Sequence, residues 1–208
     1  MPKRFVGKVC LVSGAGSGIR QETAISFARE GAKLIAADID EEGCKQTVSS
    51  IEALGGEAIF CKTDISKRAD TEAMVQATVK HFGRLDHAVN CAGITRGVSI
   101  PTHEYPEDRW YQVIAVNLTG MWYSVKAQLN KNRVNAVCPT AIETPTIMDG
   151  RLNLSNNQEL REKFTSEQAM MRIGQPKEVA DVVLWLSSDE SSFITGHAMP
   201  VDGGAFAK

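Results

Sequence analysis

The chain has 208 residues, of which 23 are basic and 25 acidic, so its formal net charge is −2. This length is typical of one domain with a sizeable core, and the balanced charge does not indicate a nucleic-acid or anionic-membrane partner. The five cysteines are scattered, and no apolar run has the length of a membrane span or the form of a signal peptide. We therefore expect a cytoplasmic protein with reduced thiols and no metal site.

The first expected strand leads directly into a glycine-rich turn. Residues 9–12 (VCLV) form a short apolar run, which is followed by residues 13–18 (SGAGSG) and then by an amphipathic helix with Ile19 on its apolar side. In this context glycines let the backbone approach a pyrophosphate, which the N–H groups of the helix can bind. The alternative is a tight turn without a ligand. Arg20 stands where a third glycine is expected.

Acidic residues follow the next two expected strands. Lys33–Ala37 leads to Asp38, about 20 residues after the glycine turn, and the third strand leads to Asp64 and Ile65. A carboxylate at Asp38 can accept hydrogen bonds from an adenosine ribose and repels a 2′-phosphate, so it favours NAD over NADP. The alternative for Asp38 is a capping role at the helix expected over Asp40–Leu54. Asp64 is expected at the carboxyl edge of the sheet, where it could face an adenine amino group.

The fourth expected strand, Leu85–Val89, follows a helix over Arg68–Phe82 and runs into residues 90–93 (NCAG). Small residues there let the backbone approach a ligand, although a plain turn has the same composition. The next helix, Glu107–Leu129, carries Asn117 inside an apolar stretch. Such an Asn is either a structural hydrogen-bonding centre or a functional group.

The alternation of strands and helices fails after Leu129. The chain passes almost directly into Val134–Pro139, which has the pattern of another core strand, whereas a complete βαβ unit needs about 30 residues or more. One central strand and one helix are therefore missing near 129–133, and we expect the two neighbouring strands to close over the gap. A polar loop is expected over Thr140–Asn157 and a helix over Gln158–Met170. A second helix begins at Pro176, and the last strand is expected at Ala198–Val201.

These elements predict one domain over residues 1–208, an α/β fold with a doubly wound parallel sheet of the Rossmann type that lacks one central strand and helix.

The motifs together resemble the short-chain dehydrogenase/reductase family over nearly the whole chain. Residues 13–19 are similar to the family's T-G-x-x-x-G-I-G cofactor turn, residues 90–93 to its N-N-A-G, and residues 139–144 (PTAIET) to its P-G-x-x-x-T. The resemblance implies hydride transfer between NAD(P) and a small carbonyl or alcohol substrate, in a homo-oligomer. With the residue arguments above, it predicts one set of cofactor contacts: Gly14, Gly18, Ile19, Asp38, Asp64, Ile65, Asn90, Ala92, Gly93, Lys126, Ile142 and Thr144.

The catalytic positions of the family are the main departure. The resemblance gives a catalytic match only at Asn117, because the family's Ser and Tyr-x-x-x-Lys lie on the missing strand and helix. Tyr123 and Lys126 are three residues apart on one helix, but their spacing and place differ from the family pattern, and Lys126 is either near the cofactor or a solvated helix charge. We expect a lineage of NAD-preferring oxidoreductases in which this 208-residue chain has little or no dehydrogenase activity. The alternatives are a non-catalytic nucleotide-binding or interaction protein and a truncated product that folds poorly.

Overall fold

The main sheet of the protein contains four parallel strands. The computed structural model describes residues 3–97, 100–128, 133–150 and 152–207. The strands lie side by side in the order β3-β2-β1-β4 and have the bounds Val9–Ser13 (β1), Lys33–Asp38 (β2), Ala58–Lys62 (β3) and His87–Asn90 (β4). All five residues of β1 are buried, because neighbours pair with both of its edges and helices cover both of its faces.

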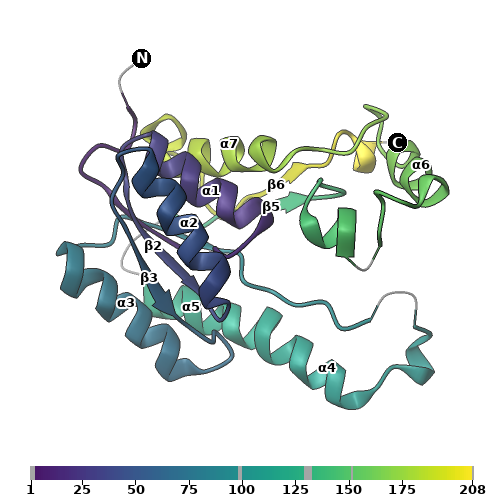
Figure 1. The fold of residues 1–208 in the computed structure, drawn as a ribbon, viewed down its shortest axis with the longest axis horizontal. Helices are drawn as coiled ribbons and strands as arrows, with labels where there is room; N and C mark the ends of the chain where they lie inside the picture. The colour runs from purple at the N-terminus through teal and green to yellow at the C-terminus, as the bar shows by residue number, and fades with distance from the viewer. Residues whose placement is uncertain (1–2, 98–99, 129–132, 151, 208) are drawn as a thin grey trace.

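Helices cover the two faces of this sheet (Figure 1). One face carries α1 (Gly18–Arg29), α2 (Glu41–Ala53) and α7 (Pro176–Ser187), and the other carries α3 (Arg68–Phe82) and α5 (Met121–Gln128). The predicted doubly wound arrangement is confirmed for this part of the chain. No helix among the described residues is both long and apolar enough to cross a membrane.

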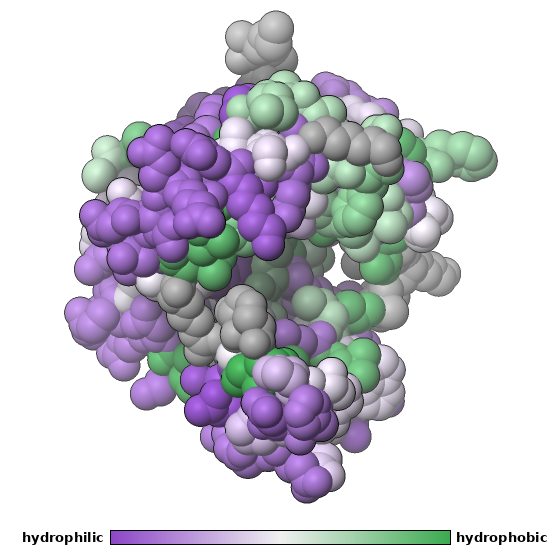
Figure 2. Space-filling view, turned by 90° about the vertical axis from the view of Figure 1, so that its right-hand side faces the viewer, coloured by the Kyte–Doolittle hydropathy of each residue, from purple (hydrophilic) through white to green (hydrophobic). Residues whose placement is uncertain are grey.

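Helices α4 (Glu107–Val113) and α6 (Gln158–Ser166) project on the right-hand side of Figure 1, and the space-filling view in Figure 2 shows that this side is hollowed at its centre. Figure 2 looks onto this side and shows apolar surface inside the hollow, between a larger upper and a smaller lower part of the molecule. The carboxyl ends of parallel strands are where α/β sheets collect ligands, so this hollow is relevant to the site described below.

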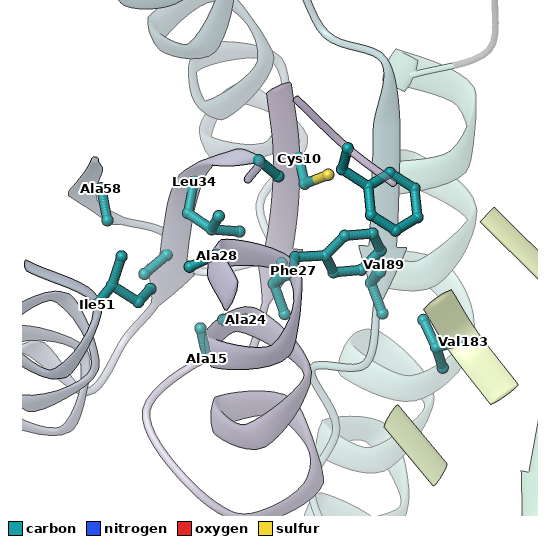
Figure 3. Packing of buried hydrophobic residues seen from close by; sticks show 14 of the residues in the cluster. Cys10, Ala15, Ala24, Phe27, Ala28, Leu34, Ile51, Ala58, Val89 and Val183 are labelled. Carbon is teal, nitrogen blue, oxygen red and sulfur yellow. The ribbon is translucent and has the colours of Figure 1, made fainter. Parts of the chain in front are cut away.

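The core has one cluster on each face of the sheet. Phe27, Leu34 and Ile51 belong to the cluster that lies under α1 and α2, and all three side chains are fully buried (Figure 3). Leu11, Ile35 and Met74 form the smaller cluster under α3. Burying each side chain of this size contributes roughly 1.5–3 kcal/mol.

The remaining two strands form a separate sheet. β5 (Ala136–Pro139) pairs with β6 (Ala198–Val201), and no described residue of β4 pairs with β5. Our expectation that the neighbouring strands close over the gap is therefore wrong. The predicted seam at 129–133 lies outside the described residues, except for Arg133. Arg133 donates to the carbonyls of Ser188 and Ile194 at 3.1 Å each, which holds the start of β5 against the chain that follows α7.

The long helix expected over Glu107–Leu129 is not regular. A π-helical segment, Ile114–Gly120, separates α4 from α5. Isolated π-helical turns within α-helices are frequently found at functional sites. Asn117 lies in this segment.

The polar loop expected over Thr140–Asn157 is more ordered than its composition suggests. It includes a π-helical turn at Thr146–Gly150, and Leu154, Ala141 and Ile173 form a small core of their own beside α6. Leu154 is buried because Phe164 and Leu160 of α6 pack against this cluster. Short 3₁₀ turns complete the described chain at Thr102–Glu104, Asp189–Ser191 and Ala205–Ala207.

Candidate functional site

The glycine-rich turn folds back on the end of β2. Gly14 and Gly18 have φ values of +76° and +63°, in the left-handed region that favours glycine. The N–H of Gly14 donates to the carbonyl of Ala37 at 2.7 Å, and Thr47 Oγ1 on α2 donates to the carbonyl of Ala15 at 2.8 Å. These contacts hold the turn at the carboxyl edge of the sheet.

The amino terminus of α1 is open to a ligand. Ser17, at the N-cap, makes no side-chain capping bond, and the first turn contains no acidic residue. The first N–H groups of an α-helix have no partner inside the helix and carry the positive end of its dipole. The start of α1, at Gly18 and Ile19, therefore offers what a phosphate group needs.

Two carboxylates lie beside Gly16. Asp38 Oδ2 accepts the N–H of Gly16 at 3.0 Å, and its Oδ1 accepts the N–H of Asp40 at 3.1 Å. The N-cap of α2 is Asp40, whose Oδ1 accepts the N–H of Gly43 at 3.2 Å, so Asp38 does not cap this helix itself. A carboxylate oxygen that accepts one bond keeps a second lone pair for a ribose hydroxyl. A Cβ on Gly16 would lie 3.1 Å from Asp38 Oδ2 and 3.3 Å from Asp40 Oδ2. The sequence analysis did not single out Asp40 as a second carboxylate here, although its place two residues after Asp38 was a usable signal.

Asp64 is held by its own turn. Its Oδ1 accepts bonds from the N–H and the hydroxyl of Ser66, at 3.1 and 2.6 Å, and Lys67 Nζ lies 3.4 Å from its Oδ2. Partial burial raises the pKa of Asp64, but the bonds from Ser66 and Lys67 outweigh it and lower the pKa below its ordinary value. The next residue, Ile65, is buried against Gly120 of the π-helical segment. The contact of Asp64 and Ile65 with an adenine remains a prediction.

The end of β4 is tied to β1 and to α5. Ser13 Oγ accepts the N–H groups of Cys91 and Ala92 at 3.3 and 3.4 Å. The side-chain amides of Asn90 and Gln128 form a reciprocal pair, with Nδ2 to Oε1 at 2.6 Å and Nε2 to Oδ1 at 3.0 Å. Since Ser13 stands at the end of β1 beside Asn90 in the register, these bonds place the 90–93 turn next to the glycine-rich turn.

Asn117 clamps the chain that follows this turn. Its Oδ1 accepts the N–H of Ile94 and its Nδ2 donates to the carbonyl of Ile94, both at 2.9 Å. A Cβ on Gly93 would lie 3.4 Å from Asn117 Oδ1. The side chain is exposed and both ends of its amide are engaged, which establishes the structural role that the sequence analysis left open. A catalytic role for Asn117 remains a prediction.

Arg20 bridges the two turns. Its Nη1 donates to the carbonyl of Cys91 at 3.3 Å, and a Cβ on Gly14 would meet Arg20 Cδ at 2.7 Å and Ala92 Cα at 2.9 Å. The arginine therefore lies across Gly14, over the carboxyl ends of β1 and β4. The clash between helix and strand that a large residue at position 20 could cause is avoided, because the side chain extends along the edge of the sheet.

The carboxyl-terminal part of the chain reaches the start of α1. A Cβ on Gly18 would lie 3.3 Å from Thr144 Cγ2, so Thr144 contacts the glycine-rich turn. Ile142 is buried and pairs with Gly174 through an isolated β-bridge. Glu143 stands between Ile142 and Thr144 in the chain. Its carboxylate accepts a hydrogen bond from Arg161 of α6 at 2.9 Å and one from the side chain of Gln175 at 2.7 Å. Gly18 and Thr144, which are more than 120 positions apart in the chain, therefore meet at one edge, and their contacts with a cofactor remain predictions.

Lys126 is not brought to this edge by any described contact. Its Nζ lies 4.7 Å from the centre of the Trp122 ring, a cation–π arrangement on the exposed side of α5. The neighbouring Tyr123 ring packs against Trp122, with the ring centres 5.3 Å apart. No described contact joins Tyr123 to Lys126, and Lys126 as a cofactor contact remains a prediction.

The assembled edge has the features of a dinucleotide site. It combines a glycine turn, an open helix terminus, two carboxylates beside Gly16 and a cation at Arg20. Among the described residues no group of three or more His, Cys, Asp and Glu side chains is arranged to hold a metal ion.

The sequence matches two family models. Residues 8–133 match a model described as short chain dehydrogenase, and residues 128–205 match one described as Enoyl-(Acyl carrier protein) reductase. The two matches overlap at residues 128–133.

Relatives of this chain are oxidoreductases by name. An uncharacterized oxidoreductase of Thermotoga maritima is 34% identical, with 98% of this chain and 99% of that protein covered. The short chain dehydrogenase/reductase astE of Aspergillus oryzae is 32% identical, covering 95% and 94%. The first alignment extends over 253 residues although this chain has 208, so it contains positions without a counterpart here.

Solved structures have the same fold. A levodione reductase has a TM-score of 0.89 at 27% identity, with 98% of this chain and 99% of that chain covered. The carveol dehydrogenase of Mycobacterium avium in complex with NAD has a TM-score of 0.88 at 25% identity, covering 99% and 100%.

Proposed function

The chain belongs to the short-chain dehydrogenase family, and from this premise we propose that it binds NAD in preference to NADP at the edge formed by the glycine-rich turn, Asp38 and Thr144. The family is one of oxidoreductases that use a nicotinamide cofactor. The carboxylate pair beside Gly16 is the observation that carries the NAD preference, because a 2′-phosphate there would meet Asp38 and Asp40.

Different residues of the chain would bind different parts of the cofactor. The ribose hydroxyls would bond to Asp38, the diphosphate would lie at the start of α1 near Gly18 and Arg20, and Thr144 would contact the nicotinamide end. Bound NAD(H) supplies the hydride or its acceptor. The protein binds and orients this group, and the glycines keep side chains out of the path of its phosphates.

We propose that proton transfer in this lineage depends on the family's Ser and Tyr-x-x-x-Lys, which would lie on a segment that this chain lacks after about Leu129. The overlap of the two family matches at 128–133 and the longer alignments of the relatives support this proposal. The substrate class is a small carbonyl or alcohol. The relatives' names favour an enzyme lineage over a non-catalytic binding protein.

A homo-oligomer is part of the same proposal. The rod made of α4, the π-helical segment and α5 exposes a row of large apolar side chains, each between 55% and 65% accessible: Trp110, Tyr111, Leu118 and Trp122. A row of this kind is typical of a surface that contacts another protein.

Thermal melting with NAD and with NADP tests the cofactor proposal. A ligand that binds only the native state stabilises it by about 2.7 kcal/mol at a hundred times its dissociation constant. We expect NAD to raise the melting temperature more than NADP at equal concentration. Equal shifts, or none, would contradict the proposal.

Turnover is a separate measurement. We expect the 208-residue chain to bind NADH and to oxidise it slowly or not at all with a panel of carbonyl compounds. The intact mass of the natural protein, or its transcript, would show whether an additional segment is inserted after about Leu129. An inserted segment without Tyr-x-x-x-Lys would contradict the proposed catalytic residues.

A further inference from the structure

The protein contains a strand-shaped slot between its two sheets. A cavity of about 860 Å³ is bordered on one side by the whole of β4 and on the other by residues 133–137, at the start of β5. Helix α5 forms one wall and helix α7 the opposite wall. This slot is distinct from the glycine-rich turn, none of whose residues lines it.

The edge of β4 that faces the slot carries backbone N–H and C=O groups that can pair with another strand. The N–H of Asp86 donates to the carbonyl of Val9 on β1 at 3.0 Å. Successive residues of a strand direct their backbone groups to alternate sides, so His87 and Val89 direct theirs away from β1 and toward the slot. No backbone partner for His87 or Val89 occurs among the residues that the structure describes.

The edge of β5 has the same property. The N–H of Ala136 donates to the carbonyl of His197 at 2.8 Å, and the N–H of Gly196 donates to the carbonyl of Val134 at 2.7 Å. Asn135 and Val137 therefore direct their backbone groups away from β6, again without a backbone partner in the described part of the chain. The slot thus lies between two open strand edges, each of which is a template for another strand.

The walls specify the side chains of such a strand. Met121 and Val125 of α5 line one face of the slot, and Val183 and Leu186 of α7 line the other. Val89 and Val183 are both labelled in Figure 3, where they border the main cluster. A strand between two apolar walls alternates its side chains toward both, so nearly all of its residues must be apolar.

We propose that this slot binds one parallel β-strand donated by a different polypeptide. The occupant is an extended segment of about four to six consecutive apolar residues, rich in Val and Ile, free of proline, with any charges outside its ends. It adds to β4 and to β5 at the same time and joins the two sheets into one. This inference stands on the backbone geometry and does not depend on the proposed cofactor.

Two observations favour a strand over another ligand. The slot has an open strand edge on each side, at His87 and Val89 of β4 and at Asn135 and Val137, and the alignment with the Thermotoga maritima relative is longer than this chain. A second copy of the chain is a poor donor, since every described strand is already paired within its own sheet. Strand addition to an exposed sheet edge is a recurring mode of peptide recognition.

The test uses the full chain and a synthetic peptide, Lys-Ile-Val-Val-Ala-Val-Ser-Lys, acetylated and amidated at its ends. The control peptide has N-methyl groups on alternate residues, which remove the N–H donors but keep the apolar side chains. We expect one peptide to bind per chain. At a hundred times the dissociation constant, amide exchange at His87, Val89 and Val137 should slow about a hundredfold, whereas Ala88 and Ala136, which already pair within their sheets, should change little. The control peptide should bind at least tenfold more weakly.

Matched variants locate the binding. Val125→Arg places a charge on the wall of the slot, whereas Trp122→Arg places the same charge on the exposed side of the same helix. We expect only Val125→Arg to abolish peptide binding, with circular dichroism showing that both variants are folded. Three outcomes would overturn the proposal: no binding of the peptide to the folded chain, equal binding of the N-methylated control, or protection of the same amides by dimerisation in the absence of peptide.

Discussion

The carboxylate of Asp38 accepts the backbone N–H of Gly16 at 3.0 Å, so the end of the second strand and the glycine-rich turn form one hydrogen-bonded unit. This bond places the negative charge of Asp38 within the turn itself. Cofactor preference and the geometry of the turn are therefore coupled through one side chain.

Replacing Asp38 tests this coupling. In Asp38→Asn an amide oxygen can still accept the N–H of Gly16, but the charge is lost. We expect the preference for NAD over NADP, measured as the ratio of dissociation constants, to fall by about tenfold or more, because a charge-assisted hydrogen bond is worth about 1.5–3 kcal/mol. Asp181→Asn on α7 makes the same change of charge at an exposed position and should leave the ratio unchanged. A constant ratio in Asp38→Asn would count against the ribose role.

Arg20 provides a second prediction. Its guanidinium has five N–H donors, and one described bond, to the carbonyl of Cys91, engages Nη1. We expect Arg20→Met to weaken NAD binding about tenfold at low salt, and less at high salt, because screening reduces the attraction between exposed charges. Titration calorimetry at two salt concentrations measures this, with Arg29→Met at the other end of α1 as the control. Unchanged binding would contradict a contribution of Arg20 to phosphate binding, and tighter binding would show that Arg20 obstructs the phosphates.

A comparison of Gly14→Ala with Gly55→Ala separates the energetic cost of backbone strain from that of steric contact. Gly14→Ala requires a φ of +76° and puts a Cβ 2.9 Å from the backbone of Ala92. Gly55→Ala requires the same φ of +76°, but its Cβ would meet nothing within 4 Å. We expect Gly55→Ala to cost about 1 kcal/mol of the free energy of unfolding and Gly14→Ala to cost more than about 2 kcal/mol. Urea unfolding measures both, and equal losses would contradict the steric explanation.

Asn117 tests the clamp on the loop after β4. Asn117→Ala removes two hydrogen bonds to Ile94, each worth about 0.5–1.5 kcal/mol. We expect a loss of about 1–2 kcal/mol in the free energy of unfolding and faster proteolysis near Ile94. Gln112→Ala, on the exposed side of α4, is the control for the loss of a side-chain amide. Full stability and unchanged proteolysis in Asn117→Ala would refute the structural role.

His87 gives the protein a pH dependence. Burial lowers the pKa of His87, whose ring centre lies 5.3 Å from that of Phe5 and 6.4 Å from that of Phe27. The negative charges of Asp86 and Asp189 oppose this lowering of the pKa. The positive charges of Lys8 and Arg133 add to it. Because the folded-state pKa is below the unfolded value of about 6.5, the native state binds fewer protons than the unfolded state in this range. Stability from this group is complete above about pH 6.5 and is lost as the pH falls toward the folded-state pKa.

The variant His87→Phe removes this titration but keeps an aromatic ring beside Phe5 and Phe27. We expect its free energy of unfolding to fall less than that of the parent protein between about pH 7.5 and 5.5. His103→Phe is the control, because the His103 side chain is 80% exposed. Identical pH profiles for the parent and His87→Phe would show that another group is responsible.

Much of the nucleotide-binding half follows from the sequence alone. The strand at residues 9–12, the glycines after it and Asp38 lie close together in the chain, so local patterns were enough to predict their arrangement. The predicted bounds of α3 match the structure, and those of α2 differ by one residue at each end, because a strong helical period and a capping Asp40 specify them locally. The short connection before Val134 also predicts that one strand and one helix are missing, and this stays a prediction.

The tertiary structure decided what depends on contacts between distant segments. Sequence patterns describe local periodicity, but the orientation of a side chain depends on neighbours that may be 70 residues away, as for Arg20 and Cys91. The same holds for Asn117, whose amide is engaged by Ile94, and for Lys126, whose ammonium lies over Trp122. The arrangement of the sheets also depended on tertiary contacts: β4 and β5 do not pair, and a cavity lined by residues of α5 and α7 lies between them.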